Sequence, residues 1–229
     1  RSRGRAALVV ATDTALYARD DPGEATQGAG AVAMLVDRDP DLVSFGDAQG
    51  IGSVDETDFL KPNQQFPSVD GKRSMQVYLA RMREALQDFA RNGGDIHPDT
   101  FSLVPFHTPF PGMVRKAAAL GFRHSIRDTS VEDRLADQIG RQPRPGAFDD
   151  HEAYLDGIKS YTDELRQTTT HEEWYERTVE PTPAIAREVG HWYPGSVPVA
   201  RTAGLQPAFE PDRAPTGQNT LVASHGPAT

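Results

Sequence analysis

The sequence predicts a mixed α/β fold, and three features of the chain support it. Two short apolar runs lie close together, at residues 6–11 (AALVVA) and 28–36 (GAGAVAMLV). Continuous apolar runs of this length are typical of strands buried on both faces. Over residues 72–91, apolar residues instead recur with the 3.6-residue period of a helix. Two neighbouring buried strands imply a layered sheet with helices packed against it.

The elements that follow the strands are set by apolar spacing and by helix-ending residues. The helix over 72–91 is the strongest in the chain, and Asn92-Gly93-Gly94 ends its pattern. Residues 101–106 (FSLVPF) predict a strand, and the chain becomes helical again past Pro111. His107 therefore lies at a strand-to-helix junction, where side chains commonly face a cleft.

The second half of the chain predicts mainly helices. Residues 131–187 form a polar amphipathic region, interrupted by a Pro-rich link at 141–145, and we expect a helical insertion there. After the turn at Pro194-Gly195, residues 196–209 predict a helix and 219–223 a last strand. No boundary for a second domain is visible.

Composition excludes several functional classes. The 229 residues include 33 acidic and 24 basic ones, a net charge of −9 that disfavours general nucleic-acid binding. No apolar run approaches the roughly 18 residues of a membrane span and no signal sequence is visible, so we expect a cytoplasmic protein. Only four residues are Lys, a balance suited to high salt. The chain begins at Arg1, directly before an apolar run, and we therefore expect it to be a fragment of a longer protein.

The absence of cysteine excludes disulfides, thiolate metal sites and a cysteine nucleophile. Other motifs carry little chemistry. Gly28-Ala29-Gly30 opens a strand rather than joining a strand to a helix, so close strand packing is favoured over dinucleotide binding. His171-Glu172-Glu173 lacks a second His at helical spacing and predicts a solvated helix face, not a metal site.

His107 is the strongest catalytic candidate. It lies in the segment FHTPFPGMVRK, at the end of a predicted buried strand and before a helix. An imidazole in that place can polarise or protonate a carbonyl oxygen, because its pKa lies near neutrality. A hydrogen-bonded core histidine is the competing interpretation.

Several segments, in order, resemble the hydroxymethylglutaryl-CoA synthase family. FHTPFPGMVRK resembles the segment that bears its active-site histidine, and DFLKPNQQFPSVDGKRSMQVYL resembles the stretch before it. ALVVATDTALYA, TQGAGAVAML and REVGHWYPGSV match further segments, so the similarity covers nearly the whole chain. The sequence as a whole resembles the haloarchaeal members of this family most. The resemblance implies a partial thiolase-like layered αβαβα fold, a single unit with the end of the first half at about 1–70 and the second half at about 71–229.

The resemblance also implies an acyl-transfer reaction. Family members load acetyl from acetyl-CoA onto a Cys, form a carbanion with a Glu base, add it to acetoacetyl-CoA and release hydroxymethylglutaryl-CoA by hydrolysis. No other cofactor and no metal is expected. By the same resemblance His107 holds the acetoacetyl group and donates a proton. The other implied substrate-site residues are Thr26, Ser74, Lys116, His191, Ser224, Tyr17 and Asp58, of which Lys116 meets a CoA phosphate and Ser224 lies in an acyl-binding loop.

This chain departs from the family pattern at several places. His191 stands where the family usually has Asn, and Gly112 where many members have a second Lys. The C-terminal segment ASHGPAT only partly resembles the SYGSG loop of the family. The nucleophilic Cys and the Glu base precede the segment that matches Arg1, so we expect the chain alone to be inactive.

Three functions remain open from the sequence. The first is hydroxymethylglutaryl-CoA synthase of a mevalonate-type pathway, and the second is the carrier-protein-dependent synthase that installs β-branches in polyketides. The third is a non-catalytic subunit that docks on a Cys-bearing thiolase-like chain. A homodimer, a separately encoded Cys-bearing half and poor solubility of the isolated chain are further expectations.

Overall fold

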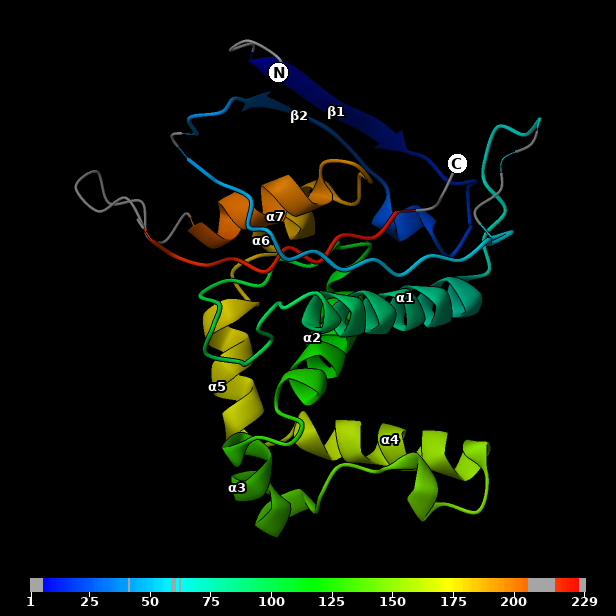
Figure 1. Cartoon of the computed structure of the whole chain (residues 1–229). Coiled ribbons are helices and arrows are strands. Elements are labelled where there is room, and N and C mark those ends of the chain that lie inside the picture. Colours follow the sequence, from blue (N-terminus) through cyan, green and yellow to red (C-terminus); the bar gives the residue numbers. More distant parts are fainter. Residues whose placement is uncertain (1–5, 41, 59–60, 62, 206–216, 227–229) are drawn as a thin grey trace.

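The computed structural model describes residues 6–40, 42–58, 61, 63–205 and 217–226 (Figure 1). Within these residues the fold is mixed α/β. It consists of one two-stranded sheet, seven α-helices and two 3-10 helices, in the order β1 (Ala7–Ala15), η1 (Glu24–Thr26), β2 (Gly28–Val36), α1 (Gly71–Arg91), α2 (Pro111–Ser125), α3 (Ser130–Ile139), η2 (Pro145–Ala147), α4 (His151–Leu165), α5 (Thr169–Thr178), α6 (Ala184–Val189) and α7 (Ser196–Leu205).

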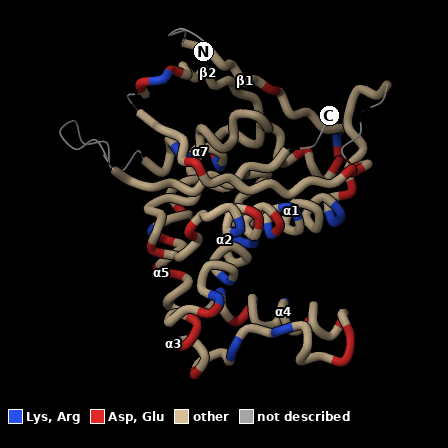
Figure 2. Tube along the Cα trace, viewed as in Figure 1, with Lys and Arg blue, Asp and Glu red and all other residues tan. Residues whose placement is uncertain are grey.

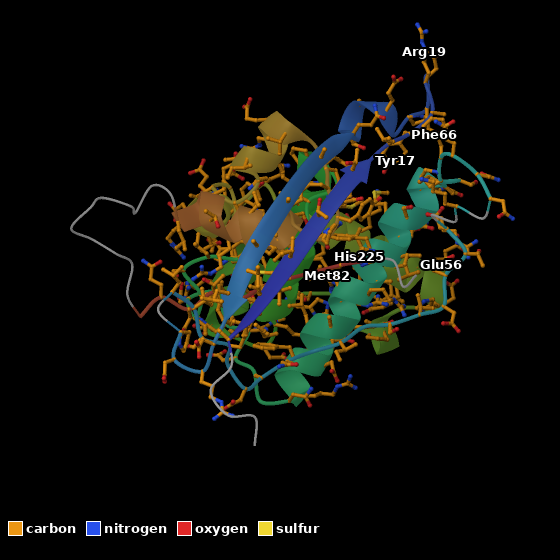
Figure 3. The ribbon with its side chains drawn as sticks, turned by 90° about the horizontal axis from the view of Figure 1, so that it is seen from above. Tyr17, Arg19, Glu56, Phe66, Met82 and His225 are labelled. Atoms are coloured by element: carbon orange, nitrogen blue, oxygen red, sulfur yellow. The ribbon has the colours of Figure 1, made fainter. Side chains whose placement is uncertain are left out.

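The two predicted strands pair with each other as an antiparallel ribbon. Ala7 lies opposite Val36 and Ala15 opposite Gly28, so β1 continues beyond the predicted end at residue 11. Seen from above, the ribbon lies across one face of the molecule, with Tyr17 just past the end of β1 (Figure 3). The strands were correctly placed.

The prediction that both strands are buried was wrong. Leu8 and Val9 point to opposite faces of β1, yet they are 68% and 44% exposed, and Leu35 of β2 is 71% exposed. Figure 2 shows few charged residues along the ribbon, in contrast to the helices below it. The apolar pattern favours burial, but none of the described residues covers the end of the ribbon that holds Leu8 and Leu35.

Gly28 and Gly30 explain how β2 packs on its inner side. A Cβ at Gly30 would lie 2.5 Å from the Trp192 ring, and one at Gly28 would lie 2.5 Å from the backbone of Gly190. Gly190 itself has a φ of +76°, which favours glycine. The glycines therefore permit close packing, as predicted, and bring the segment at 190–192 against β2.

Helix α1 forms where the sequence predicts it. Asp70 caps its N-terminus by accepting hydrogen bonds from the backbone N–H groups of Lys72 and Arg73. Past its end, Gly93 has a φ of +84°, which permits the chain to turn away. One face of α1, with Tyr78, Met82 and Leu86, is buried in the core.

Helix α2 is the centre of the core. Ala117, Ala118 and Ala119 are fully buried, and such small side chains allow neighbouring helices to approach closely. Figure 1 shows α1 crossing one side of α2, with α5 on another. His107 precedes α2 by only four residues, so the core holds it firmly.

The predicted strands at 101–106 and 219–223 lie side by side but form only isolated parallel bridges. Leu103 pairs with Thr220, and Phe106 with Ala223. The N–H of Ala223 donates to the Pro105 carbonyl at 3.0 Å, and that of His107 donates to the Ala223 carbonyl at 2.8 Å. Pro105 has no N–H to donate, which limits the ladder. The two segments were predicted to be strands, and the structure gives them isolated bridges instead of a regular strand pair.

The region at 131–187 is helical, as predicted, with α3, α4 and α5 in it. The Pro-rich link between α3 and α4 is extended and ends in η2. Helix α7 confirms the start of the helix expected over 196–209, although residues 206–209 lie outside the described part.

One correction concerns His171, which the sequence placed on a solvated face. It is only 4% exposed, because α5 turns this side chain toward Phe122 of α2, with ring centroids 5.3 Å apart. Glu173 of the same motif is exposed, as expected.

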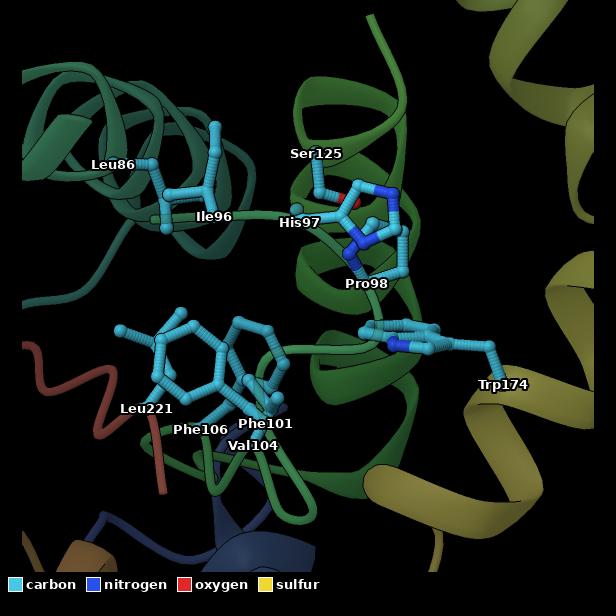
Figure 4. A pocket seen from close by; sticks show the side chains of 11 residues that line it. Leu86, Ile96, His97, Pro98, Phe101, Val104, Phe106, Ser125, Trp174 and Leu221 are labelled. Atoms are coloured by element: carbon cyan, nitrogen blue, oxygen red, sulfur yellow. The ribbon is translucent and has the colours of Figure 1, made fainter. Parts of the chain in front are cut away.

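A small cavity of about 30 Å³ lies between α1, α2 and α5, lined mainly by apolar groups such as Leu86, Phe101 and Trp174 (Figure 4). It has room for about one water molecule. None of the predicted site residues lines it. Among the described residues, no helix combines the length and the apolar character needed to cross a bilayer.

Candidate functional site

The imidazole of His107 is the centre of a buried polar cluster. Its backbone is fixed on both sides, since its N–H donates to Ala223 and its carbonyl accepts from the Tyr78 hydroxyl at 2.9 Å. The residue is 1% exposed. The side chain is thus held at the junction between Phe106 and α2, where the sequence places it.

Both ring nitrogens of His107 have partners. Nε2 lies 3.2 Å from Nε2 of His191, and Nδ1 lies 2.7 Å from Oγ of Ser196, the first residue of α7. The Ser196 hydroxyl also lies 3.3 Å from the Tyr193 carbonyl, to which it can donate.

These contacts limit which ring nitrogens of His107 and His191 can carry a proton. A serine hydroxyl has a single proton. If Ser196 donates it to the Tyr193 carbonyl, Ser196 accepts from Nδ1–H of His107. Nε2 of His107 then carries no proton and accepts from Nε2–H of His191. If Ser196 instead donates to Nδ1 of His107, Nε2 of His107 carries the proton and donates to Nε2 of His191. Both assignments leave the two imidazoles neutral.

The electrostatics of the cluster also favour neutral rings. Burial, together with the nearby His191 and His225, holds the pKa of His107 well below its usual range. Burial lowers the pKa of His191 to about 4, despite the opposing effect of Asp13. The charged form of each ring loses its hydration in this environment. His107 is therefore a neutral hydrogen-bonding group near pH 7.

His191 is fixed by the segment that precedes β2. Its N–H donates to the Thr26 carbonyl at 2.9 Å, and Gln27 forms a bridge to it. The Thr26 hydroxyl donates to the Gly23 carbonyl at 2.7 Å. The structure thus brings His107 and His191 together and places the backbone of Thr26 next to that of His191.

Tyr17 reaches the same cluster through Tyr193. Their hydroxyl oxygens lie 3.3 Å apart, and the Tyr193 ring centroid lies 4.1 Å from that of His191 and 5.9 Å from that of His107. The Tyr193 N–H donates to Asp13 at 3.1 Å. Burial raises the pKa of Tyr17, so its hydroxyl keeps its proton.

Ser74 and Asp58 form a pair next to α1. The Ser74 hydroxyl donates to the Asp58 carboxylate, which also accepts from the Asp70 N–H at 2.8 Å. Ser74 lies one helical turn before Tyr78, whose hydroxyl contacts His107. The pair is thus linked to the cluster through α1, without a direct hydrogen bond to His107 among the described residues.

Lys116 and Ser224 are the two predicted site residues that face solvent. Lys116 is exposed on α2, and its Nζ lies 2.8 Å from Sδ of Met75 on α1. Ser224 is exposed, but the next residue, His225, has its ring centroid 5.0 Å from Tyr78 and 6.0 Å from His107.

The sequence prediction missed four residues of the cluster: Ser196, Tyr193, Tyr78 and His225. Ser196 and Tyr193 lie in the GHWYPGSV segment that marked His191, and a hydroxyl at the start of a helix was the available signal. For Tyr78, helical spacing indicated a core position and nothing indicated the contact with His107.

Comparison with known proteins gives a consistent result. Residues 53–226 match the family model described as hydroxymethylglutaryl-coenzyme A synthase C terminal. The chain is 63% identical over 226 residues to the hydroxymethylglutaryl-CoA synthase of Haloferax volcanii, covering 99% of this chain and 51% of that protein. It is 40% identical over 128 residues to the mitochondrial hydroxymethylglutaryl-CoA synthase of Mus musculus, covering 51% of this chain and 25% of that protein.

Solved structures show the same fold. MvaS in complex with 3-hydroxy-3-methylglutaryl coenzyme A matches with a TM-score of 0.66 at 24% identity, over 88% of this chain and 45% of that one. The HMG synthase of the curacin biosynthetic pathway, in complex with apo donor-ACP, matches with a TM-score of 0.59 at 22% identity, over 87% and 40%. The chain spans about half the length of the curated relative from Haloferax.

Proposed function

This chain belongs to the hydroxymethylglutaryl-CoA synthase family, and on that basis we propose that it supplies the C-terminal part of an enzyme that makes 3-hydroxy-3-methylglutaryl-CoA. The reaction condenses acetyl-CoA with acetoacetyl-CoA and water and releases CoA, as a step of a mevalonate-type pathway in the cytoplasm. The observation that supports this function best is the buried His107, held between His191 and Ser196.

We infer that His107 binds the ketone oxygen of the acetoacetyl group. As the acetyl carbanion forms the new carbon–carbon bond, negative charge develops on that oxygen, and an N–H of the neutral imidazole stabilises it by a hydrogen bond. The proton that completes the new hydroxyl is the one that the base removes from the acetyl methyl group. Ser196 and His191 fix the position of the ring, so little reorganisation is needed during the reaction. Removal of the ring would then lower the rate more than it weakens binding.

The other predicted residues have supporting roles in this proposal. Tyr17 and Thr26 line the acyl site beside His191, with Ser74 and Asp58 at the α1 side and Ser224 in the neighbouring loop. The exposed Lys116 supplies positive charge for a CoA phosphate on an otherwise acidic protein. These assignments rest on the family motifs and on the positions given above.

The chain has no cysteine, so a thiolate nucleophile must come from another polypeptide or from another part of the same protein. We propose that the missing part packs on the ribbon of β1 and β2, where Leu8 and Leu35 pair across the strands with both side chains exposed. The layered αβαβα arrangement would be completed by that contact, with residues 1–70 ending its first half and 71–229 forming most of its second. Homodimerisation of the completed enzyme is also proposed.

The test is a condensation assay with acetyl-CoA and acetoacetyl-CoA in high salt. It uses the chain alone, the chain mixed with a Cys-bearing N-terminal half from a relative, and the same mixture with His107→Ala. We expect activity only in the unmodified mixture, with a loss of at least about 100-fold for His107→Ala. The variant's heat-unfolding transition shows whether it is folded.

Replacing acetoacetyl-CoA by acetoacetyl on a carrier protein separates the two enzyme functions. A preference for the carrier-bound substrate would favour the β-branching synthase and overturn the role of Lys116. An inactive mixture in which both parts are folded and associated would favour a non-catalytic subunit.

A further inference from the structure

A second polar pocket lies away from the His107 cluster, lined by residues of α2 and α5 and of the link between α4 and α5. Its volume is about 330 Å³, within the range of small-molecule sites. The residues that line it are mainly polar: Arg115, Arg166, Gln167, His171, Glu172 and Tyr175. No residue of the cluster around His107 is among them.

His171 is the feature of this pocket that needs a ligand. The residue is 96% buried, and neither ring nitrogen has a hydrogen-bond partner among the described residues. A neutral imidazole has one donor and one acceptor, and leaving both unpaired in the interior is unfavourable. The ring lines the pocket and stacks against Tyr175 at an interplanar angle of 17°.

Two arginines present further donors to the same space. The guanidinium of Arg115 lies 4.6 Å above the Tyr175 ring, and its nearest carboxylate oxygens are 3.8 and 4.0 Å away. Arg166 lies 3.7 Å from Asp163. Both arginines therefore form ion pairs with carboxylates, but these separations exceed ordinary hydrogen-bond lengths, so within the described part of the chain no carboxylate accepts a hydrogen bond from either guanidinium.

The backbone adds to the positive character of the pocket. Helix α5 begins at Thr169, directly after Arg166 and Gln167, and Thr168 caps it by accepting from the His171 N–H. The N-terminus of a helix carries partial positive charge and favours anions.

The nearby charges also make the electrostatic potential at His171 positive. Burial, followed by the charges of Arg166 and Arg115, lowers the pKa of His171 to about 4. Glu172 also lines the pocket and forms an ion pair with Arg115 at 4.0 Å, so it offsets part of this charge, but the two arginines outnumber it among the lining residues. A group with negative charge in the pocket would therefore find donors and a favourable potential.

We propose that this pocket binds the oxyanion group of a small molecule, with Arg166, Arg115 and His171 as its donors. The shared chemistry is that of a phosphate or a carboxylate. The site is separate from the one proposed for CoA, since Lys116, although next to Arg115 in α2, contacts Met75 of α1 instead. The proposal does not depend on the chain's acyl-transfer function.

The experiment measures heat unfolding and calorimetric binding of the 229-residue chain with inorganic phosphate or succinate, at constant ionic strength in KCl. Arg166→Gln removes one donor. Arg91→Gln, at the end of α1, is the matched control, because Arg91 is exposed and lies outside the pocket. Phosphate stabilises many proteins without a site, so only the difference between the two variants counts.

We expect one of the two anions to bind the unmodified chain and Arg91→Gln equally, and Arg166→Gln about ten-fold more weakly. In NMR titrations the same anion should raise the pKa of His171. Phosphate binding without succinate binding would identify a phosphate site, and the reverse a carboxylate site. Equal effects on all three proteins would mean an adventitious ion only, and binding of neither anion would equally overturn the proposal.

Discussion

Oγ of Ser196 lies 2.7 Å from Nδ1 of His107, although 89 residues separate the two in the chain. The first residue of α7 thus orients a ring that is held by the start of α2. This contact is shorter than that of the same hydroxyl to the Tyr193 carbonyl, which is 3.3 Å. The contact links a positioning residue to the ring proposed to meet the substrate.

Ser196→Ala should reduce kcat of the reconstituted enzyme by about ten-fold, because one hydrogen bond that fixes the imidazole is lost. The KM for acetoacetyl-CoA should change little, and the pH profile of kcat should shift, since Nδ1 of His107 loses its hydrogen-bond partner. Ser125→Ala is the control, as it removes a hydroxyl that donates to the Phe122 carbonyl, its hydrogen-bond partner among the described residues. Equal kinetics for both variants would remove Ser196 from the site.

The chain should lose stability as the pH falls from about 6.5 toward 4. The folded-state pKa of both His171 and His191 is about 4, below the value of about 6.5 in an unfolded chain. In this window the unfolded state binds protons that the folded state does not, so the free energy of unfolding decreases on acidification. The slope is about 1.4 kcal/mol per pH unit for each histidine.

Denaturant unfolding at pH 7.5 and at pH 5 checks this expectation. His171→Asn should reduce the dependence of the free energy of unfolding on pH by about one proton equivalent, because one of the histidines with a lowered pKa is removed. An unchanged free energy of unfolding between the two pH values would contradict the burial of both rings.

Lys116→Gln should raise the KM for acetoacetyl-CoA about five-fold and leave kcat unchanged in the reconstituted enzyme. An exposed charge pair contributes about 1 kcal/mol or less, and it acts equally in the ground state and the transition state. Added salt should narrow the difference. Lys159→Gln on α4 is the control, as this lysine is exposed and pairs with Asp163. A similar rise in KM for the control would indicate a general charge effect.

Leu35→Lys should weaken association with a Cys-bearing half by more than about ten-fold and improve solubility of the isolated chain. Leu35 faces Leu8 across the ribbon, and burying one leucine contributes roughly 1.5–3 kcal/mol. Leu42→Lys is the control, because Leu42 is 86% exposed and lies outside the strands. Size-exclusion chromatography with light scattering measures both quantities.

Unchanged association of the Leu35 variant would place the contact elsewhere. If the unmodified chain is a soluble monomer that unfolds cooperatively, the expectation of poor solubility is wrong.

Local physical chemistry is sufficient for some features of this chain, which the sequence therefore predicts. Helix α1 follows from apolar spacing, the Asp70 cap and the glycines after Arg91. The placement of His107 between an extended segment and a helix follows from Pro111, which favours a helix start. The motifs around these elements are contiguous in the chain, so they indicate the family without a structure.

Other features depend on contacts between distant segments, and only the tertiary structure decided them. An apolar strand pattern encodes a preference for burial, but whether Leu8 is covered depends on which other segments are present. His171 is buried because α5 packs on α2, although its immediate neighbours are charged. His107, His191 and Ser196 meet because Gly28 and Gly30 let the segment at 190–192 approach β2, and no local pattern specifies that approach.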